Sequence, residues 1–164
     1  MTQQELPTHY LYPAALFFSK EPHLINTILG SCVAVCLYDT TLKVGGMNHY
    51  MLPYWNGQGL ASPKYGNIAI EKLVEQMVKS GCSRQNLIAK VFGGGEVIDA
   101  GTNMFNIGKR NIEIAETMLR DMGIKIAASD TGGKLGRKVQ FNTLTGAVMM
   151  KFIQRTITNN ANEK

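Results

Sequence analysis

The chain of 164 residues is poor in cysteine, with thiols only at Cys32, Cys36 and Cys82. Three cysteines cannot all pair within one chain, and their number is far below that of a small secreted domain held together by disulfides. We therefore expect reduced thiols and a cytoplasmic protein.

Targeting signals and long apolar runs are also missing. The first seven residues contain no basic stretch followed by an apolar one, and no later run approaches the roughly 20 apolar residues that cross a bilayer. We expect a protein that is neither secreted nor inserted in a membrane.

Charge of one sign is only weakly in excess, because 17 Lys and Arg stand against 12 Asp and Glu, for a net charge of +5. This balance favours an acidic partner only modestly. The basic residues are scattered, with one tight group at Lys134, Arg137 and Lys138. Nucleic-acid-binding proteins concentrate such residues in a patch or stripe, so we expect no nucleic-acid partner and interpret the group as a solvated face.

The composition is that of a globular protein, with 45% hydrophobic and 18% charged residues. We expect a single domain over residues 1–164, with a core from about residue 12 to 153 and a polar tail over 156–164.

The order of expected elements indicates the fold class. Apolar and β-branched runs bounded by turn residues predict strands at 12–19, 24–29, 32–38, 44–52, 87–92, 124–129, 138–141 and 147–153. Apolar residues at helical spacing predict helices over 66–80 and 107–122. We expect an α+β fold in which two principal helices cover a mainly antiparallel sheet system.

A thiol follows directly after a Gly-Ser pair at the junction of two strand-like runs, in the order Gly30, Ser31, Cys32. Such a junction leaves backbone N–H groups unpaired. The N–H groups of Ser31 and Cys32 could therefore stabilise the oxyanion that forms when a thiolate attacks an amide.

The strands on either side of the polar turn at 39–43 predict a hairpin that supplies a base. If the turn is centred on residues 40 and 41, Cys32 faces His49 and Cys36 faces Gly45. Directly opposed residues share a face and lie close enough for thiol and imidazole to meet. A register slip of one residue would turn His49 to the other face.

Two simpler interpretations stay open. Cys32 could be a small buried hydrophobe and His49 a hydrogen-bonded strand histidine. A zinc site built from Cys32, Cys36 and His49 is disfavoured, because structural zinc sites usually have four ligands. We expect no metal and no cofactor, and we interpret Cys36 and Cys82 as core residues.

The run Gly93-Gly94-Gly95 resembles a phosphate loop only superficially, because no Lys-Ser or Lys-Thr follows it. We expect Gly93 and Gly94 to provide close backbone packing or a substrate-facing loop. Thr131, followed by two glycines, is expected in a turn near the site and is a further candidate for the substrate-facing loop.

Five segments resemble, in composition and order, the signature of the CheD family, the chemoreceptor glutamine deamidases. They are LGSCVAVC at 29–36, GMNHYMLP at 46–53, KVFGGG at 90–95, NIGKRN at 106–111 and DTGG at 130–133. The similarity runs from about Tyr12 to Phe152. It implies a cysteine-hydrolase fold similar to that of certain deamidating toxins, and a Cys-His-Thr triad.

Cys32 and His49 match the first two members of that triad. The family's threonine lies six residues before the nucleophile, where this chain has Asn26, with Thr27 one position later. Strand alternation sends these two side chains to opposite faces. We predict that Asn26 orients His49, with Thr27 as the alternative.

The resemblance implies a protein-glutamine glutaminase that acts on methyl-accepting chemotaxis receptors through a thioester intermediate. A cysteine protease or a transglutaminase could use the same dyad. A binding module that docks on receptors, or on a CheC-type phosphatase, is the alternative from another functional class.

Overall fold

The structure is a computed structural model and describes residues 5–96 and 106–153; the polar tail expected at 156–164 lies outside this range. The strands are β1 (Thr8–Tyr10), β2 (Ala15–Ser19), β3 (Leu24–Leu29), β4 (Val33–Asp39), β5 (Val44–His49), β6 (Leu87–Gly93), β7 (Lys125–Thr131), β8 (Gly136–Asn142) and β9 (Val148–Ile153). The helices are α1 (Gly66–Lys79), α2 (Ile107–Asp121) and the 3-10 turn η1 (Arg84–Asn86).

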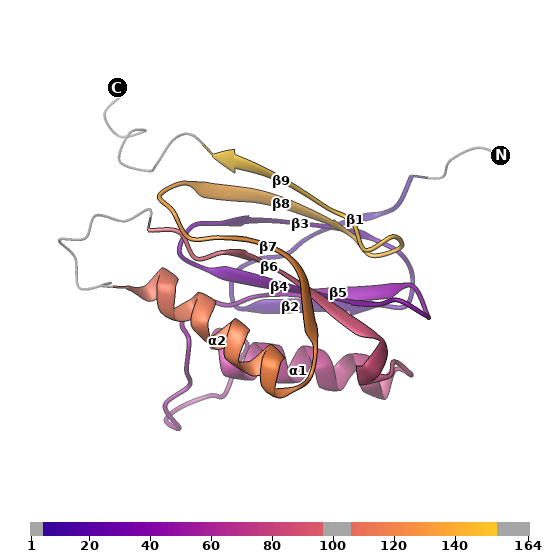
Figure 1. Cartoon of the computed structure of the whole chain (residues 1–164), viewed down its shortest axis with the longest axis horizontal. Coiled ribbons are helices and arrows are strands. Elements are labelled where there is room, and N and C mark those ends of the chain that lie inside the picture. Colours follow the sequence, from indigo (N-terminus) through magenta and orange to yellow (C-terminus); the bar gives the residue numbers. More distant parts are fainter. Residues whose placement is uncertain (1–4, 97–105, 154–164) are drawn as a thin grey trace.

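These elements form three layers (Figure 1). One sheet has the strand order β1-β3-β8-β9, and the other has the order β2-β5-β4-β6-β7. Helices α1 and α2 cover the outer face of the five-stranded sheet, and the four-stranded sheet lies on its other face. Only β1 with β3 and β6 with β7 run parallel among the described strand pairs. The α+β fold with two principal helices and mainly antiparallel sheets is confirmed.

Strand β4 lies at the centre of the molecule, and all seven of its residues are buried. Its odd-numbered residues, such as Val35, pack against the helices in one core. Its even-numbered residues, such as Cys36, pack between the two sheets in a second core. A strand covered on both faces reads as a continuous apolar run, as here.

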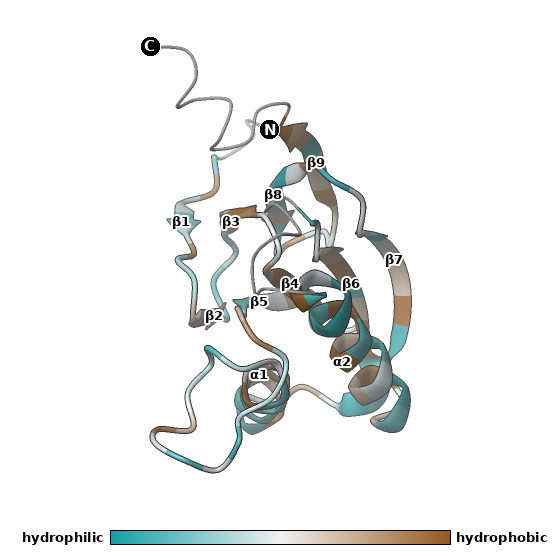
Figure 2. Cartoon of the chain, turned by 90° about the vertical axis from the view of Figure 1, so that its left-hand side faces the viewer, coloured by the Kyte–Doolittle hydropathy of each residue, from teal (hydrophilic) through white to brown (hydrophobic). Residues whose placement is uncertain are grey.

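The two helices are amphipathic, with polar residues on their outer sides (Figure 2). Helix α1 buries Ile70, Leu73 and Met77, which recur at helical spacing. Helix α2 buries Leu119 but also the polar side chain of Asn111. A buried asparagine in a helix needs hydrogen-bond partners, and those of Asn111 lie in the functional site.

The expected register of the β4–β5 hairpin is wrong by two residues. Asp39 pairs with Val44, and Cys36 pairs with Met47 rather than with Gly45. The turn is longer than expected because the Asp39 carboxylate accepts hydrogen bonds from the N–H groups of Thr41 and Leu42. This side-chain cap stabilises a four-residue loop over 40–43.

Candidate active site

Thr27 and His49 meet in the layer between the two sheets. The Oγ1 atom of Thr27 lies 2.7 Å from Nδ1 of His49 and 2.6 Å from the carbonyl oxygen of Leu11. A carbonyl only accepts, so the single hydroxyl proton of Thr27 is donated to Leu11, and Thr27 must accept from the Nδ1–H group of His49. His49 is therefore held as the Nδ1–H tautomer, with a lone pair on Nε2.

Asn26 does not contact His49. The expectation that Asn26 orients this histidine is therefore wrong. Its side-chain oxygen accepts a hydrogen bond from Gln140 at 3.0 Å. Ile25, Thr27 and Leu29 are buried, whereas Asn26 lies on the outer face of β3. Strand alternation places Asn26 and Thr27 on opposite faces, as expected. Thr27, however, is the residue that contacts His49.

Cys32 lies one residue before β4, and its half-buried side chain packs against the core between the sheets. Val33 pairs with Tyr50, which corrects the expectation that Cys32 is directly opposite His49. The same register sets His49 opposite Ala34, two residues along from Cys32. A shift of two residues preserves the face, so His49 and Cys32 stay on one side of the hairpin.

A side chain replaces one backbone hydrogen bond between β4 and β5 beside His49. The N–H group of Val35 donates to the side-chain oxygen of Asn48 at 2.9 Å instead of to a backbone carbonyl of β5. The backbone carbonyl of His49 accepts from Ala14 on the other side, at 2.8 Å. Asn48 therefore replaces one ladder bond and leaves His49 anchored to the chain segment that leads into β2.

Burial makes the uncharged forms of both candidate groups dominant. It raises the pKa of the Cys32 thiol to about 11 and lowers the pKa of His49 to about 4. The Nε2 atom of His49 is buried and makes no hydrogen bond within residues 5–96 and 106–153. A neutral imidazole with a free lone pair is the form in which histidine can accept a proton.

The glycine run holds the segment that carries Cys32. The N–H groups of Gly94 and Gly95 donate to the carbonyls of Cys32 and Gly30, at 2.8 and 2.9 Å. Gly93 has a φ of +108°, and a Cβ there would collide with the Cys32 carbonyl. Gly93 and Gly94 are buried. Close backbone packing is confirmed for them, whereas direct substrate contact stays a prediction.

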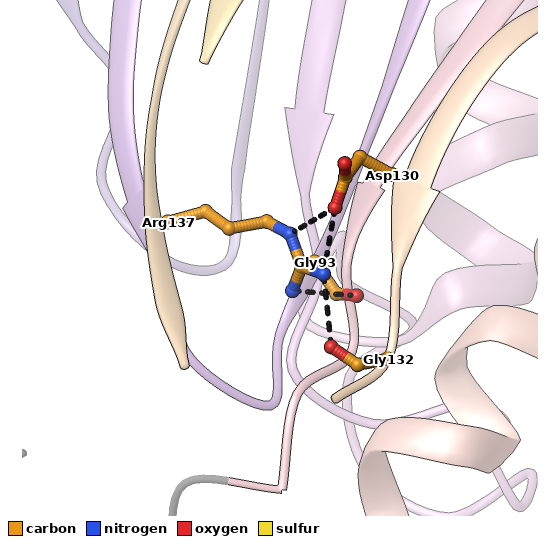
Figure 3. A network of polar contacts seen from close by, with 4 residues as sticks. All are labelled: Gly93, Asp130, Gly132 and Arg137. Carbon is orange, nitrogen blue, oxygen red and sulfur yellow. Dashed lines mark hydrogen bonds and ion pairs between the residues drawn. The ribbon is translucent and has the colours of Figure 1, made fainter. Parts of the chain in front are cut away.

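Arg137 ties the ends of three strands together (Figure 3). Its guanidinium pairs with Asp130 at 2.8 Å and donates to the carbonyls of Gly93 and Gly132. The expectation of a solvated basic face is wrong for Arg137, which is buried, although Lys134 and Lys138 are exposed. This network fixes the end of β6 beside Cys32. The expectation that Thr131 lies in a turn is wrong, because Thr131 is the last residue of β7 and pairs with Gly93.

The remaining cysteines are both buried, and burial together with the neighbouring Asp39 carboxylate raises the pKa of the Cys82 thiol to about 11. Cys36 is buried with its Sγ 3.4 Å from the sulfur of Met47, and Cys82 is buried near the end of α1. The interpretation of both as core residues is confirmed. No three His, Cys, Asp or Glu side chains converge as a metal site among the described residues. Neither described helix is long and apolar enough to cross a membrane.

Comparison with known proteins decides the family. A family model described as CheD chemotactic sensory transduction matches residues 51–152. A protein of Sulfurimonas denitrificans is 49% identical over 158 residues, covering 93% of this chain and 98% of its own length. This chain belongs to the CheD family. A Trichlorobacter lovleyi member is also 49% identical, over 87% of this chain and 88% of its own.

The relatives carry a functional name. The proteins of Sulfurimonas denitrificans and Trichlorobacter lovleyi, and a protein of Rhodospirillum rubrum that is 41% identical over 93% of this chain and 86% of its own, are each named "Probable chemoreceptor glutamine deamidase CheD". The alignments extend over most of the CheD chain, beyond the 51–152 segment that matches the family model.

Three further residues support the site and were not identified from the sequence. Asn48, Asn111 and Arg137 are all buried polar side chains that bond to backbone groups around Cys32 or His49. Asn48 and Asn111 lie inside two of the family-like segments, which was the available signal. For Arg137, the available signal was strand alternation. It lies two and four residues before the apolar Val139 and Phe141, and so on the same buried face of β8.

Proposed function

We propose that this CheD protein is a protein-glutamine glutaminase that deamidates glutamine side chains of methyl-accepting chemotaxis receptors. Cys32 is the nucleophile, His49 the general base and acid, and Thr27 the residue that orients His49. The observation that carries the proposal is the hydrogen-bond chain from His49 through Thr27 to Leu11, which leaves Nε2 unprotonated and without a partner among the residues that the structure describes. The names of the relatives supply the substrate.

The first half of the reaction forms a thioester. The thiol is protonated at neutral pH, because its pKa is about 11, so the proton passes to Nε2 of His49 as the sulfur attacks the glutamine carbonyl carbon. The carbonyl oxygen becomes an oxyanion. His49 then returns the proton to the departing nitrogen, ammonia leaves, and a γ-glutamyl thioester remains on Cys32.

Hydrolysis completes the cycle. His49 takes a proton from water as the water oxygen attacks the thioester carbon, and it returns that proton to the leaving sulfur. The net change is glutamine plus water to glutamate plus ammonia, with no other reactant consumed. Each turnover replaces a neutral side chain with a carboxylate, which can alter helix packing in a receptor.

The backbone around the nucleophile supports stabilisation of the oxyanion. Neither the N–H group of Ser31 nor that of Cys32 donates to a backbone carbonyl within the described residues. Donors aimed at the developing charge are usually a large part of acyl-transfer catalysis. We assign this role to these two N–H groups.

Ammonia release tests the proposal. The full chain is incubated with a purified receptor cytoplasmic fragment, and ammonia is measured by a coupled assay for the wild type and for Cys32→Ala. Release by the wild type alone, with the fragment uncut on a denaturing gel, is expected. Release that survives Cys32→Ala would contradict the assignment, and cleavage of the fragment would indicate a protease instead.

Two alternatives stay predictions. A transglutaminase would join the acyl group to an added amine, which mass spectrometry with a primary amine in the buffer would detect. Docking on a CheC-type phosphatase, which the family resemblance also implies, requires a direct binding measurement.

A cytoplasmic location agrees with the three free cysteines.

A further inference from the structure

The three carbonyl groups that surround Cys32 are each held by another part of the chain. The Gly30 and Cys32 carbonyls accept from the backbone N–H groups of Gly95 and Gly94. The Ser31 carbonyl accepts from the side-chain amide of Asn111, at 3.0 Å. Only the middle bond of the three depends on a side chain.

The Ser31 carbonyl and the Cys32 N–H group belong to the same planar peptide unit. This unit is trans, as are all peptide bonds of the described residues, so its C=O and N–H bonds point in opposite directions. Holding the carbonyl on Asn111 therefore directs the Cys32 N–H away from helix α2. The N–H of Cys32 also interacts with its own thiol, where it offsets part of the rise in pKa that burial causes.

The same amide also reaches the segment after the candidate base. Nδ2 of Asn111 donates to the carbonyl of Met51 at 3.0 Å, and the hydroxyl of Tyr50 donates to the Asn111 backbone carbonyl at 2.6 Å. Met51 follows His49 by two residues. One buried side chain thus links the segment of the nucleophile to the segment of the base.

The chemistry of the two partners fixes the orientation of the amide. Both are carbonyls, which only accept, so the NH2 group of Asn111 must face them. The side-chain oxygen is then left buried without a hydrogen bond among the described residues. Both donors of the amide are therefore used to hold carbonyls of the two segments that carry Cys32 and follow His49.

We infer that Asn111 is a positioning residue for the reaction: its amide fixes the Ser31–Cys32 peptide so that the Cys32 N–H donates to the oxyanion. This role rests on the proposed deamidase function. It extends that function, because Asn111 acts through the peptide and does not touch the substrate.

Two reactions of the Cys32 thiol distinguish a positioning role of Asn111 in deamidation from a general contribution to the structure of the site. Deamidation passes through an oxyanion, whereas alkylation of a thiol by iodoacetamide is a displacement at carbon that forms none. In Asn111→Asp, which keeps the shape but loses the NH2 donors, kcat for deamidation should fall about tenfold to a hundredfold. Alkylation of Cys32, followed by tandem mass spectrometry, should stay within about twofold of the wild-type rate.

The matched control is Tyr50→Phe, which removes the neighbouring buried hydrogen bond to Asn111 and leaves the amide intact. It should keep kcat within about twofold of wild type. Asn111→Ala is the second variant and should lose kcat in the same way if Asn111→Asp folds poorly, with folding checked by circular dichroism.

Three results would overturn the inference while the proposed function stands: an unchanged kcat in folded Asn111 variants, a parallel loss of alkylation and deamidation, or failure of both variants to fold. A wild type without Cys32-dependent ammonia release would overturn the proposed function, and this inference with it.

Discussion

Thr27 accepts the Nδ1–H of His49 while it donates to the Leu11 carbonyl, so the tautomer of the histidine is set by one hydroxyl proton. Thr27→Ala should lower deamidation turnover by about 10- to 100-fold, since the base would be disoriented but not removed. Thr27→Ser keeps the hydroxyl and should retain most turnover. Initial rates of ammonia release measure both.

Asn26 provides the matched control, because it is the adjacent residue on the opposite face of β3 and bonds to Gln140. Asn26→Ala should stay within about twofold of wild type. A larger loss in Asn26→Ala than in Thr27→Ala would contradict the orientation of His49 by Thr27.

Gly93 should tolerate no side chain. Both Gly93 and Gly57 have positive φ, but only at Gly93 would a Cβ collide with the Cys32 carbonyl. Gly93→Ala should lower the free energy of unfolding by more than the about 1 kcal/mol expected for backbone strain alone in Gly57→Ala. Urea titrations compare the two. Equal destabilisation, with full deamidation in Gly93→Ala, would refute the close packing of Gly93 on Cys32.

The buried histidine should make the protein sensitive to acid. The pKa of His49 is lowered from 6.5 to about 4, so the unfolded chain binds a proton over this range that the folded chain does not. Stability is therefore present above pH 6.5 and lost as pH falls toward 4. Between pH 7 and 4.5, His49 should account for about 2 to 3 kcal/mol of this loss.

Urea unfolding at the two pH values measures that contribution. His49→Gln should show a smaller decrease in unfolding free energy than the wild type, because the other titrating groups are shared by both proteins. The same decrease in both proteins would mean that His49 is not held neutral by burial.

The thiol should alkylate slowly at neutral pH. Its pKa is raised to about 11 by burial, so the thiolate fraction, and with it the iodoacetamide rate at Cys32, should rise about tenfold per pH unit from 7 to 10. A rate that levels off below pH 8 would indicate a preformed thiolate–imidazolium pair.

The fold could be predicted from the sequence where local signals were strong. Both helices follow from apolar spacing, and most strands from β-branched runs bounded by glycine and polar residues. The three-residue strand β1 was missed, because its pairing with β3 is a tertiary contact and its sequence is polar. Its short length leaves no periodicity to detect.

The site was predicted in part. The hairpin register depended on the Asp39 cap, a side-chain interaction that a count from the turn centre does not include. The choice between Asn26 and Thr27 depended on which face of β3 is buried. Apolar residues occur at both parities, at Leu24 and Ile28 as well as at Ile25 and Leu29, so alternation alone could not decide.

The intact mass of a receptor cytoplasmic fragment, before and after incubation with the CheD protein, shows whether Cys32 deamidates receptor glutamines. Each deamidation exchanges an amino group for a hydroxyl and should add about one dalton, with peptide mapping to locate the altered glutamines. We expect this increase for the wild type and for Cys36→Ala, and none for Cys32→Ala or His49→Ala. An unchanged mass with folded wild-type protein, or an increase that persists in Cys32→Ala, would contradict this expectation.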